Sequence, residues 1–345
     1  MNTKQIIQKL NTPEYNFLGE HQSLGGNIIL LTTGGSYAYG TNVETSDLDI
    51  RGICLNSKDE ILTMNCKDKP VEDKATDTVI YYLKQIIQLL LNTNPNVIEM
   101  MGTKEDHLFI LSKEGKLLRD NIGLFLSKRA SHSFGGYAIS QLRRLQNALA
   151  RDHYPQSEKE NHILGSIEGQ MNHLRSNYQK FTGENLKVYI DKSDKDDFDT
   201  EIFVDIDLKH YPLRDFKGMY SDMANVIKDY ERLNHRNSKK DDLHLNKHAM
   251  HLIRLFIMGT EILEGKGVNT HRKKDRDLLM KIRNGEFVKK KNGKDDYSEF
   301  FELVDDYDKR FKYALNNTSL PDNPDYASVN ELVKTINIGV VNNEN

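Results

Sequence analysis

One short stretch constrains the fold more than any other part of the sequence, an apolar run that ends at two glycines and a serine. Asn27 to Thr33, NIILLTT, is followed by Gly34 and Gly35, a pattern that predicts a buried strand entering a tight turn. We expect a helix from about Ser36 to Gly40. Glycines let the backbone approach a phosphate closely, and a serine at a helix start offers it a hydroxyl and an N–H group. Gly34, Gly35 and Ser36 are therefore predicted to bind phosphate.

Two aspartates follow at a second predicted strand. Leu48 to Leu55 alternates with a period of two, and it overlaps the pair Asp47 and Asp49. Residues two apart on a strand project from the same face, so both carboxylates are expected to point into one site. Nucleotidyl transfer uses two divalent cations about 4 Å apart, and such hard cations bind carboxylate oxygens. The pair is therefore predicted to bind metal.

A third carboxylate is expected from a neighbouring strand. Asp77 is the first choice because it opens a strand-like run, Thr76 to Tyr81, and Glu99 and Asp205 are weaker candidates. Asp205 also forms an Asp-x-Asp with Asp207, but no glycine turn precedes it. A solvated strand face explains that second pair more simply.

The second half of the chain holds a helical pattern with a polar stripe. In Lys247 to Glu261 a period of 3.6 places apolar residues on one side and polar residues on the other, the latter being Lys247, His251, Arg254 and Glu261. Such cations could hold a triphosphate. An ordinary amphipathic surface helix is the alternative, and spacing alone favours it.

Two basic runs and two tyrosines have functional and structural interpretations side by side. His271 to Arg276 (HRKKDR) and Val288 to Lys294 (VKKKNGK) could line an RNA backbone, although charge runs are usually solvated surface. Tyr37 and Tyr39, beside the glycine turn, could stack on a base or pack in the core.

Composition restricts the remaining classes. The net charge of −3 and the pI near 6.5 exclude a globally basic nucleic-acid binder, although local basic patches stay possible. The two cysteines, Cys54 and Cys66, are too few for a disulfide scaffold and fit a reducing cytosol. His248 and His251 with Glu99 lack the spacing of a zinc helix. We expect a cytoplasmic protein without membrane spans.

The organisation along the 345 residues predicts two domains. Residues 1–107 are expected to form an α/β catalytic core, with a helix at Leu83 to Leu91. Residues 108–345 are expected to be mainly helical, notably at Phe134 to Arg151 and at Lys247 to Gly265. A charged insertion at about 155–242 contains one strand-like run, Glu201 to Leu208.

Taken together, GGSYAYGTNVETSDLDIRG resembles the nucleotidyltransferase signature of the DNA polymerase β superfamily. The segments NPNVIEMM, KHAMHLIRL and LLMKIRNGEF resemble its branch of predicted nucleotidyltransferases associated with RNA repair. The resemblance implies an α+β fold, with a small mixed sheet and helices followed by a mainly helical domain. It also implies that Gly35 and Ser36 handle phosphate, that Asp47, Asp49 and Asp77 form the metal-binding triad, and that Lys247, His251 and Arg254 contact the nucleotide.

The expected reaction is transfer of a nucleoside monophosphate from a nucleoside triphosphate to an acceptor hydroxyl. Two Mg²⁺ ions, which Mn²⁺ can replace, are the expected cofactors. By the resemblance, the acceptor is an RNA 3′ end, such as that of a tRNA. Nucleotidylation of a protein hydroxyl and synthesis of a small nucleotide signal stay open as alternatives. The oligomeric state is not indicated by the sequence.

Overall fold

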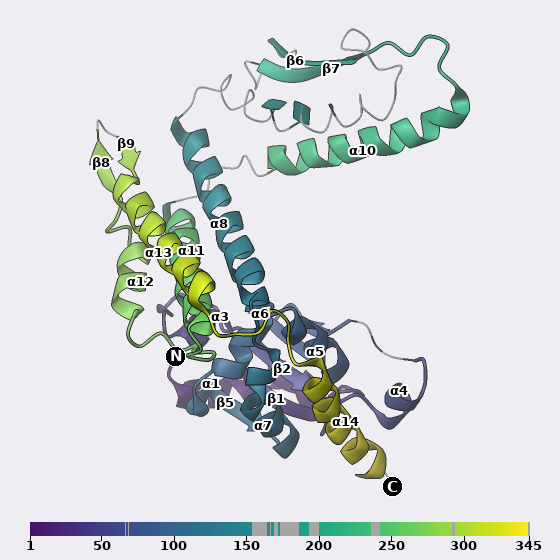
Figure 1. Cartoon of the computed structure of the whole chain (residues 1–345), viewed down its shortest axis with the longest axis vertical. Helices are drawn as coiled ribbons and strands as arrows, with labels where there is room; N and C mark the ends of the chain where they lie inside the picture. Colours follow the sequence, from purple (N-terminus) through teal and green to yellow (C-terminus); the bar gives the residue numbers. More distant parts are fainter. Residues whose placement is uncertain are drawn as a thin grey trace. The chain divides into compact units, whose positions relative to one another are not determined.

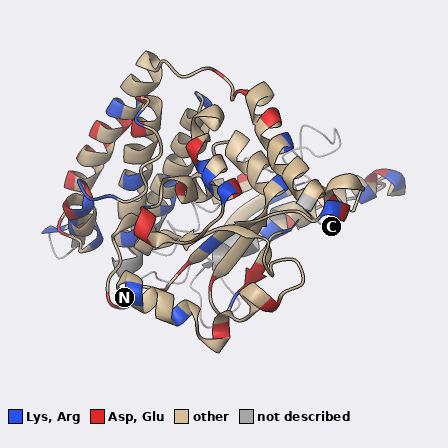
Figure 2. Ribbon diagram, turned by 90° about the horizontal axis from the view of Figure 1, so that it is seen from below, with Lys and Arg blue, Asp and Glu red and all other residues tan. Residues whose placement is uncertain are grey.

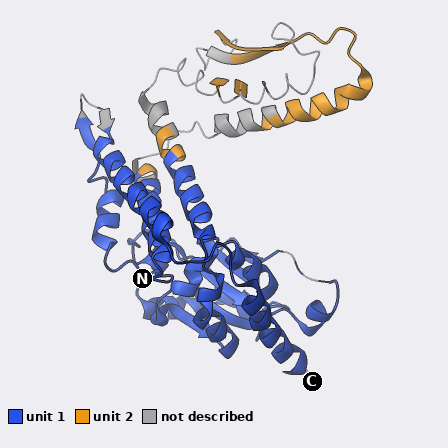
Figure 3. Ribbon diagram, in the orientation of Figure 1, with its two compact units in different colours: residues 1–142, 246–345 blue, residues 143–245 orange. Residues whose placement is uncertain are grey.

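The chain divides into two compact units in the computed structural model. The structure describes residues 1–65, 67, 69–153, 164–165, 167–168, 172, 186–192, 200–235, 242–291 and 294–343. Unit 1 comprises residues 1–142 and 246–345, and unit 2 comprises residues 143–245 (Figure 3). Part of the predicted insertion, mainly within 155–185, 193–199 and 236–241, and Cys66 lie outside the described residues.

A five-stranded mixed sheet forms the centre of unit 1 (Figure 1). Its strands, in the order β3-β4-β2-β1-β5, are Val71–Asp73, Thr78–Tyr82, Ile50–Cys54, Ile28–Thr33 and Leu108–Leu111. Strand β1 is antiparallel to β2 and β5, whereas β2 and β4 are parallel. All six residues of β1 are buried, which explains why its sequence is a continuous apolar and threonine run.

The strand β5 corrects the expected domain boundary. A catalytic core ending at residue 107 would exclude Leu108–Leu111, which pair with β1 at the edge of the sheet. The carboxy-terminal helices also belong to the same compact unit as the sheet. The physical reason is that contacts between distant segments, which periodicity does not report, define a unit.

Helices of the amino-terminal part surround the sheet. Helix α5, Leu83–Leu91, has the predicted bounds and buries four apolar residues at helical spacing, Leu83, Ile86, Ile87 and Leu90. The other helical segments are α1 (Thr3–Leu10), η1 (Pro13–Tyr15), α2 (Phe17–Glu20), α3 (Gly35–Tyr39), α4 (Lys58–Leu62), α6 (Pro95–Ile98), η2 (Glu99–Gly102), η3 (Glu105–His107), α7 (Lys113–Asp120) and η4 (Ile122–Phe125).

The carboxy-terminal part of unit 1 is mainly helical, as expected. Helix α11, Asp242–Leu263, is buried on all sides from Leu252 to Gly259, so it is not the amphipathic surface helix that its spacing favoured. The other elements are α12 (Arg276–Arg283), β8 (Lys289–Lys291), β9 (Lys294–Asp296), α13 (Ser298–Asn317) and α14 (Tyr326–Asn343). Helix α8, Arg129–His153, begins in unit 1 and continues into unit 2.

Unit 2 contains an antiparallel hairpin and a long helix. Strands β6, Leu186–Lys192, and β7, Thr200–Ile206, pair along their length, and α10 spans Leu213–His235. Its small apolar cluster includes Leu186 and Met219. Among the described residues of the chain, no helix has the length and apolar character needed to cross a membrane.

Candidate active site

The predicted site residues meet at one cavity of about 200 Å³ in unit 1. It is lined from the sheet side by the glycine turn and the aspartates, and from the other side by α11 and α12. The lining residues are Gly35, Ser36, Tyr39, Thr41, Thr45, Ser46, Asp47, Asp49, Asp77, Lys247, Met250, His251 and Arg283. Gly34 and Arg254 are the two predicted site residues that do not line it.

The aspartates lie just before the strands rather than on them. Strand β2 begins at Ile50, one residue after Asp49, and β4 begins at Thr78, one residue after Asp77. Because Ile50 pairs with Thr78 in the parallel register, Asp49 and Asp77 stand at the same level of the sheet. The strand bounds expected from the sequence were therefore two residues too early at both positions.

Asp49 and Asp77 are joined through their side chains. The two carboxyl groups share a hydrogen bond, and burial raises the pKa of Asp49 to about 6. The side chain of Asp49 is 21% exposed and that of Asp77 is 54% exposed. The same hydrogen bond lowers the pKa of the more exposed Asp77.

Arg51, the second residue of strand β2, binds both Asp49 and Asp77. Its Nη2 lies 3.4 Å from Oδ1 of Asp49 and 3.2 Å from Oδ1 of Asp77. Its Nη1 donates to the carbonyl oxygens of Ile50 at 2.9 Å and Asp77 at 2.5 Å. The planar guanidinium thus fixes the segment at Asp77, whose φ of 46° is unusual for a residue other than glycine.

The glycine turn makes room for the acidic strand. A Cβ atom on Gly35 would lie 1.8 Å from Oδ2 of Asp49, and one on Gly34 would lie 2.8 Å from Cγ of Arg51. Gly35 also has a φ of 54°, in the left-handed region. The two glycines thus leave room for Asp49 and Arg51, and phosphate binding at this turn stays a prediction.

The donor set fits a divalent cation in part. Asp49 and Asp77 face each other with two carboxylates, and Asp47 lines the same cavity with an exposed side chain. In the part of the chain that the structure describes, no three His, Cys, Asp or Glu side chains are close enough to hold a metal ion. Asp47 therefore does not complete the triad with Asp49 and Asp77 in this conformation.

The segment that follows α11 forms hydrogen bonds to the carboxy-terminal end of α3, residues 39–41. Three successive carbonyl oxygens at the end of α3 each accept one hydrogen bond from this segment. The backbone N–H of Arg272 donates to Tyr39 at 2.9 Å, Nε of Arg276 to Gly40 at 2.8 Å, and Nη1 of Arg283 to Thr41 at 2.8 Å. These bonds satisfy carbonyls that a helix end leaves without a partner.

The polar residues predicted on one face of α11 fall into two groups, one that lines the cavity and one that is buried in the core. Lys247 and His251 line the cavity, and Lys247 is exposed. Burial, with the positive charges nearby, lowers the pKa of His251 to about 4, so its imidazole is neutral at pH 7. Arg254 is only 5% exposed and lies over the ring of Tyr39, with 3.5 Å from guanidinium carbon to ring centre.

The remaining candidates do not line the cavity. Glu99 is buried, and Asp205 is exposed on β7 of unit 2. Tyr37 packs in the main core cluster, which favours packing over base stacking. His248 binds Oε1 of Gln141 through Nδ1 at 2.9 Å.

Sequence reasoning missed Arg283 and Arg51. Arg283 is the last residue of α12 and lines the cavity beside His251. Its position within LLMKIRNGEF was noted only as part of a resemblance. Arg51 continues the alternation of Asp47 and Asp49, so the same period of two could have indicated it.

The basic runs are partly structural. Arg272 is 3% exposed and binds Glu261 with both Nη atoms, at 2.6 and 2.7 Å. Lys273 and Lys274 are exposed, and the second run contains the β8 strand, Lys289–Lys291. Figure 2 shows acidic and basic residues interspersed over the described helices, in agreement with the near-neutral total charge.

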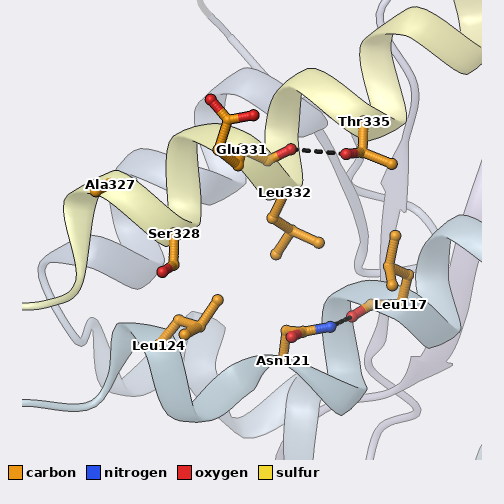
Figure 4. Close-up of a pocket in the computed structure, with 8 residues that line it drawn as sticks. All are labelled: Leu117, Asn121, Leu124, Ala327, Ser328, Glu331, Leu332 and Thr335. Carbon is orange, nitrogen blue, oxygen red and sulfur yellow. Dashed lines mark hydrogen bonds between the residues drawn. The ribbon is translucent and has the colours of Figure 1, made fainter.

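A wider hollow of unit 1 lies between α7 with η4 and α14 (Figure 4). It is lined by Leu117, Asn121, Leu124, Ala327, Ser328, Glu331, Leu332 and Thr335. Its single charged lining residue is the acid Glu331, so it offers no cation to a triphosphate. The cavity with Lys247 and Arg283 suits that ligand better.

Part of the chain is similar to a known protein family. Residues 4–167 match RlaP, the RNA repair pathway DNA polymerase beta family. This match confirms the resemblance inferred from the sequence and includes the glycine turn and all three aspartates of the cavity. Neither the curated proteins nor the solved structures gave a match.

The polymerase β-like assignment agrees with the architecture of unit 1. The match ends before α11 and α12, which supply Lys247, His251 and Arg283 to the cavity. The mixed five-stranded sheet and surrounding helices are consistent with a polymerase β-like core. The family is named after the RNA repair pathway.

Proposed function

We propose that the protein transfers a nucleoside monophosphate from a nucleoside triphosphate to an acceptor hydroxyl in a metal-dependent reaction. One observation carries the proposal: the paired carboxylates of Asp49 and Asp77 share a single cavity with the cationic side chains of Lys247 and Arg283. Carboxylates suit divalent cations and the cations suit phosphates, so the cavity has both halves of a nucleotidyl-transfer site.

Asp49 and Asp77, with Asp47 at the same cavity, would hold Mg²⁺ or Mn²⁺. A bound divalent cation would supply neutralisation of charge on the triphosphate and a lower pKa for the attacking hydroxyl. Arg51 keeps the Asp49 and Asp77 carboxyl groups facing each other through its bonds to both. Asp47 would have to turn toward that pair to serve as a third ligand.

Lys247 and Arg283 would hold the triphosphate together with the hydroxyl of Ser36. Lysine binds phosphate as a point charge and arginine through a planar fork. His251 is neutral, so it would contribute a hydrogen bond rather than a charge. The acceptor oxygen would attack the α-phosphorus while the bond to the bridging oxygen breaks, releasing pyrophosphate. A carboxylate of the site would take the hydroxyl proton.

The acceptor we favour is an RNA 3′ end, such as that of a damaged tRNA. The matched family supports this choice because it is named for the RNA repair pathway. The exposed Lys273 and Lys274 follow directly on Arg272 in the same unit as the cavity, where they could contact a phosphate backbone.

Labelling with each of the four NTPs tests the proposal. Wild-type protein is incubated with an α-labelled NTP, Mg²⁺ or Mn²⁺, and total RNA and protein, beside the variant D49N. The matched control is D205N/D207N, which changes the exposed second Asp-x-Asp. Label in RNA that is lost only in D49N would support terminal transfer to RNA. Label in protein, or in a small nucleotide, would overturn the RNA acceptor, and no label with any acceptor would overturn the reaction.

A further inference from the structure

Two oppositely charged side chains are buried behind the cavity without lining it. Glu99 is 7% exposed and Arg254 is 5% exposed, and Nη1 of Arg254 lies 3.6 Å from Oε2 of Glu99. They come from η2 and α11, which are far apart in the sequence but belong to the same unit. Neither residue is needed for the chemistry proposed above.

Glu99 is hydrogen-bonded to the first residue of α3, Gly35. Its carboxylate accepts a hydrogen bond from the backbone N–H of Gly35, an amide that has no partner inside the helix. The backbone of Glu99 is itself fixed, because the hydroxyl of Thr270 donates to its carbonyl oxygen at 2.6 Å. The residue that follows Gly35 is Ser36, whose hydroxyl belongs to the cavity.

Arg254 contacts the last residue of α3, Tyr39. Its guanidinium lies 3.5 Å from the ring centre of Tyr39, the distance of a close cation–π contact. Tyr39 also lines the cavity, although it is only 2% exposed. Both ends of this short helix are thus held by one buried ion pair.

The energetics favour a specific role for the pair. A buried ion pair seldom adds stability compared with apolar residues of similar volume, whereas loss of one partner leaves an unpaired buried charge. Burial raises the pKa of Glu99 to about 8 and lowers that of Arg254 to about 9, so desolvation opposes the charge of both groups, and the pairing rests on their 3.6 Å approach. In the described chain Nε of Arg254 has no hydrogen-bond partner. Packing alone would be served better by apolar side chains.

We propose that Glu99 and Arg254 are positioning residues that set the placement of α3, and that Arg254 acts on the nucleotide only through Tyr39. This inference rests on the proposed function for its effect on catalysis. It reassigns Arg254, which the resemblance placed among the residues that contact the nucleotide. It also gives Glu99 a role distinct from that of a metal ligand.

The test compares two double variants that both remove the buried charges. In E99Q/R254M the amide oxygen can still accept from Gly35, and the methionine sulfur can rest on the Tyr39 ring. In E99L/R254M the Gly35 N–H loses its acceptor. The control D306L/R310M replaces an exposed ion pair of α13 in the same way. For each we measure Tm, kcat, KM for the NTP, and amide exchange of residues 35–39 without nucleotide.

Positioning predicts that E99L/R254M loses kcat/KM by about tenfold relative to E99Q/R254M, the effect of leaving one buried donor unsatisfied. The unsatisfied donor should also lower the Tm of E99L/R254M slightly relative to E99Q/R254M, and exchange at 35–39 should rise only in E99L/R254M. The control should match wild type. Equal kcat/KM and equal exchange in the two double variants would overturn the proposal.

A direct contact between Arg254 and the nucleotide has a different signature. Both double variants would then show the same rise in KM, with wild-type exchange at 35–39, and the proposal would be wrong. If E99L/R254M does not fold, the single variants E99Q and R254M with their double form a cycle. Equal losses of kcat/KM in the two single variants and in the double variant would support one shared positioning role. Additive losses of kcat/KM would contradict it. Absence of transfer in wild type would reject the proposed function, while the exchange comparison would still decide this inference.

Discussion

Asp49 and Asp77 face each other from equivalent positions before two parallel strands, and their carboxyl groups share one hydrogen bond. The parallel pairing of Ile50 with Thr78 creates this relationship. It depends on backbone register, so it is retained when either carboxyl group is replaced by an amide of the same shape. This property makes aspartate-to-asparagine variants informative.

Replacing Asp49 or Asp77 by asparagine should reduce kcat for NMP transfer at least about a hundredfold, because each variant removes a charge from the proposed metal site. Circular dichroism and Tm should stay close to those of wild type. The measurement is single-turnover transfer at saturating Mg²⁺. D205N/D207N serves as the control, and activity retained in both D49N and D77N would contradict the site.

Gly35→Ala should inactivate the protein and lower its Tm. The new Cβ would lie 1.8 Å from Oδ2 of Asp49, and φ at this position is 54°, so alanine must strain the turn and displace the carboxylate. Gly136→Ala is the matched control, because no atom lies within 4 Å of its Cβ position on α8. Helix propensity predicts that the control gains up to about 1 kcal/mol of stability. An active, stable G35A would contradict this geometry.

Lys247→Ala and Arg283→Ala should each raise KM for the NTP by roughly tenfold or more, the effect of losing one charge-assisted hydrogen bond to phosphate. Steady-state kinetics with varied NTP measure the effect. Lys281→Ala changes an exposed cation of the same helix, α12, that does not line the cavity. Unchanged KM in both cavity variants would place the triphosphate elsewhere.

Acid should destabilise the fold through His107. Burial lowers the pKa of His107 from 6.5 to about 4, while its Nδ1 lies 3.0 Å from the hydroxyl of Thr33. The unfolded chain therefore binds more protons between these values, and stability present above pH 6.5 is lost as the pH falls toward 4. The loss is at most about 3 kcal/mol.

The pH dependence is measured by urea unfolding between pH 4 and pH 8. His107→Gln should flatten the slope of unfolding free energy against pH below 6.5, whereas the exposed His21→Gln should leave it unchanged. An unaltered slope in H107Q would show that other groups, such as His251, control acid stability.

The two halves of the first basic run should respond differently to substitution. Arg272→Ala leaves Glu261 and Asp275 without their buried partner, and we expect a loss of about 3–5 kcal/mol in unfolding free energy. Lys273→Ala with Lys274→Ala should leave Tm unchanged and weaken RNA binding at low salt. Filter binding across a salt series measures the second effect. Equal RNA binding in K273A/K274A and wild type would remove this run from the acceptor site.

Several elements could be predicted because their information is local. The apolar run before Gly34 predicted β1, and the helical spacing of Leu83 to Leu91 predicted α5 with its bounds. The motif residues Ser36, Asp47, Asp49 and Asp77 were also predicted, and they line one cavity. Strand starts were less accurate, because the alternation continues into residues that have no ladder partner.

The sequence by itself determined the acidic pair, the glycine turn and the helical character of the second half, since turn chemistry and hydrophobic period act between near neighbours. Tertiary structure alone decided which residues meet. It set Asp49 against Asp77 by strand register, brought Arg283 to the cavity, and buried Arg254 on Tyr39. These relationships arise from packing between distant segments, and a period along the chain carries no information about which segments pack together.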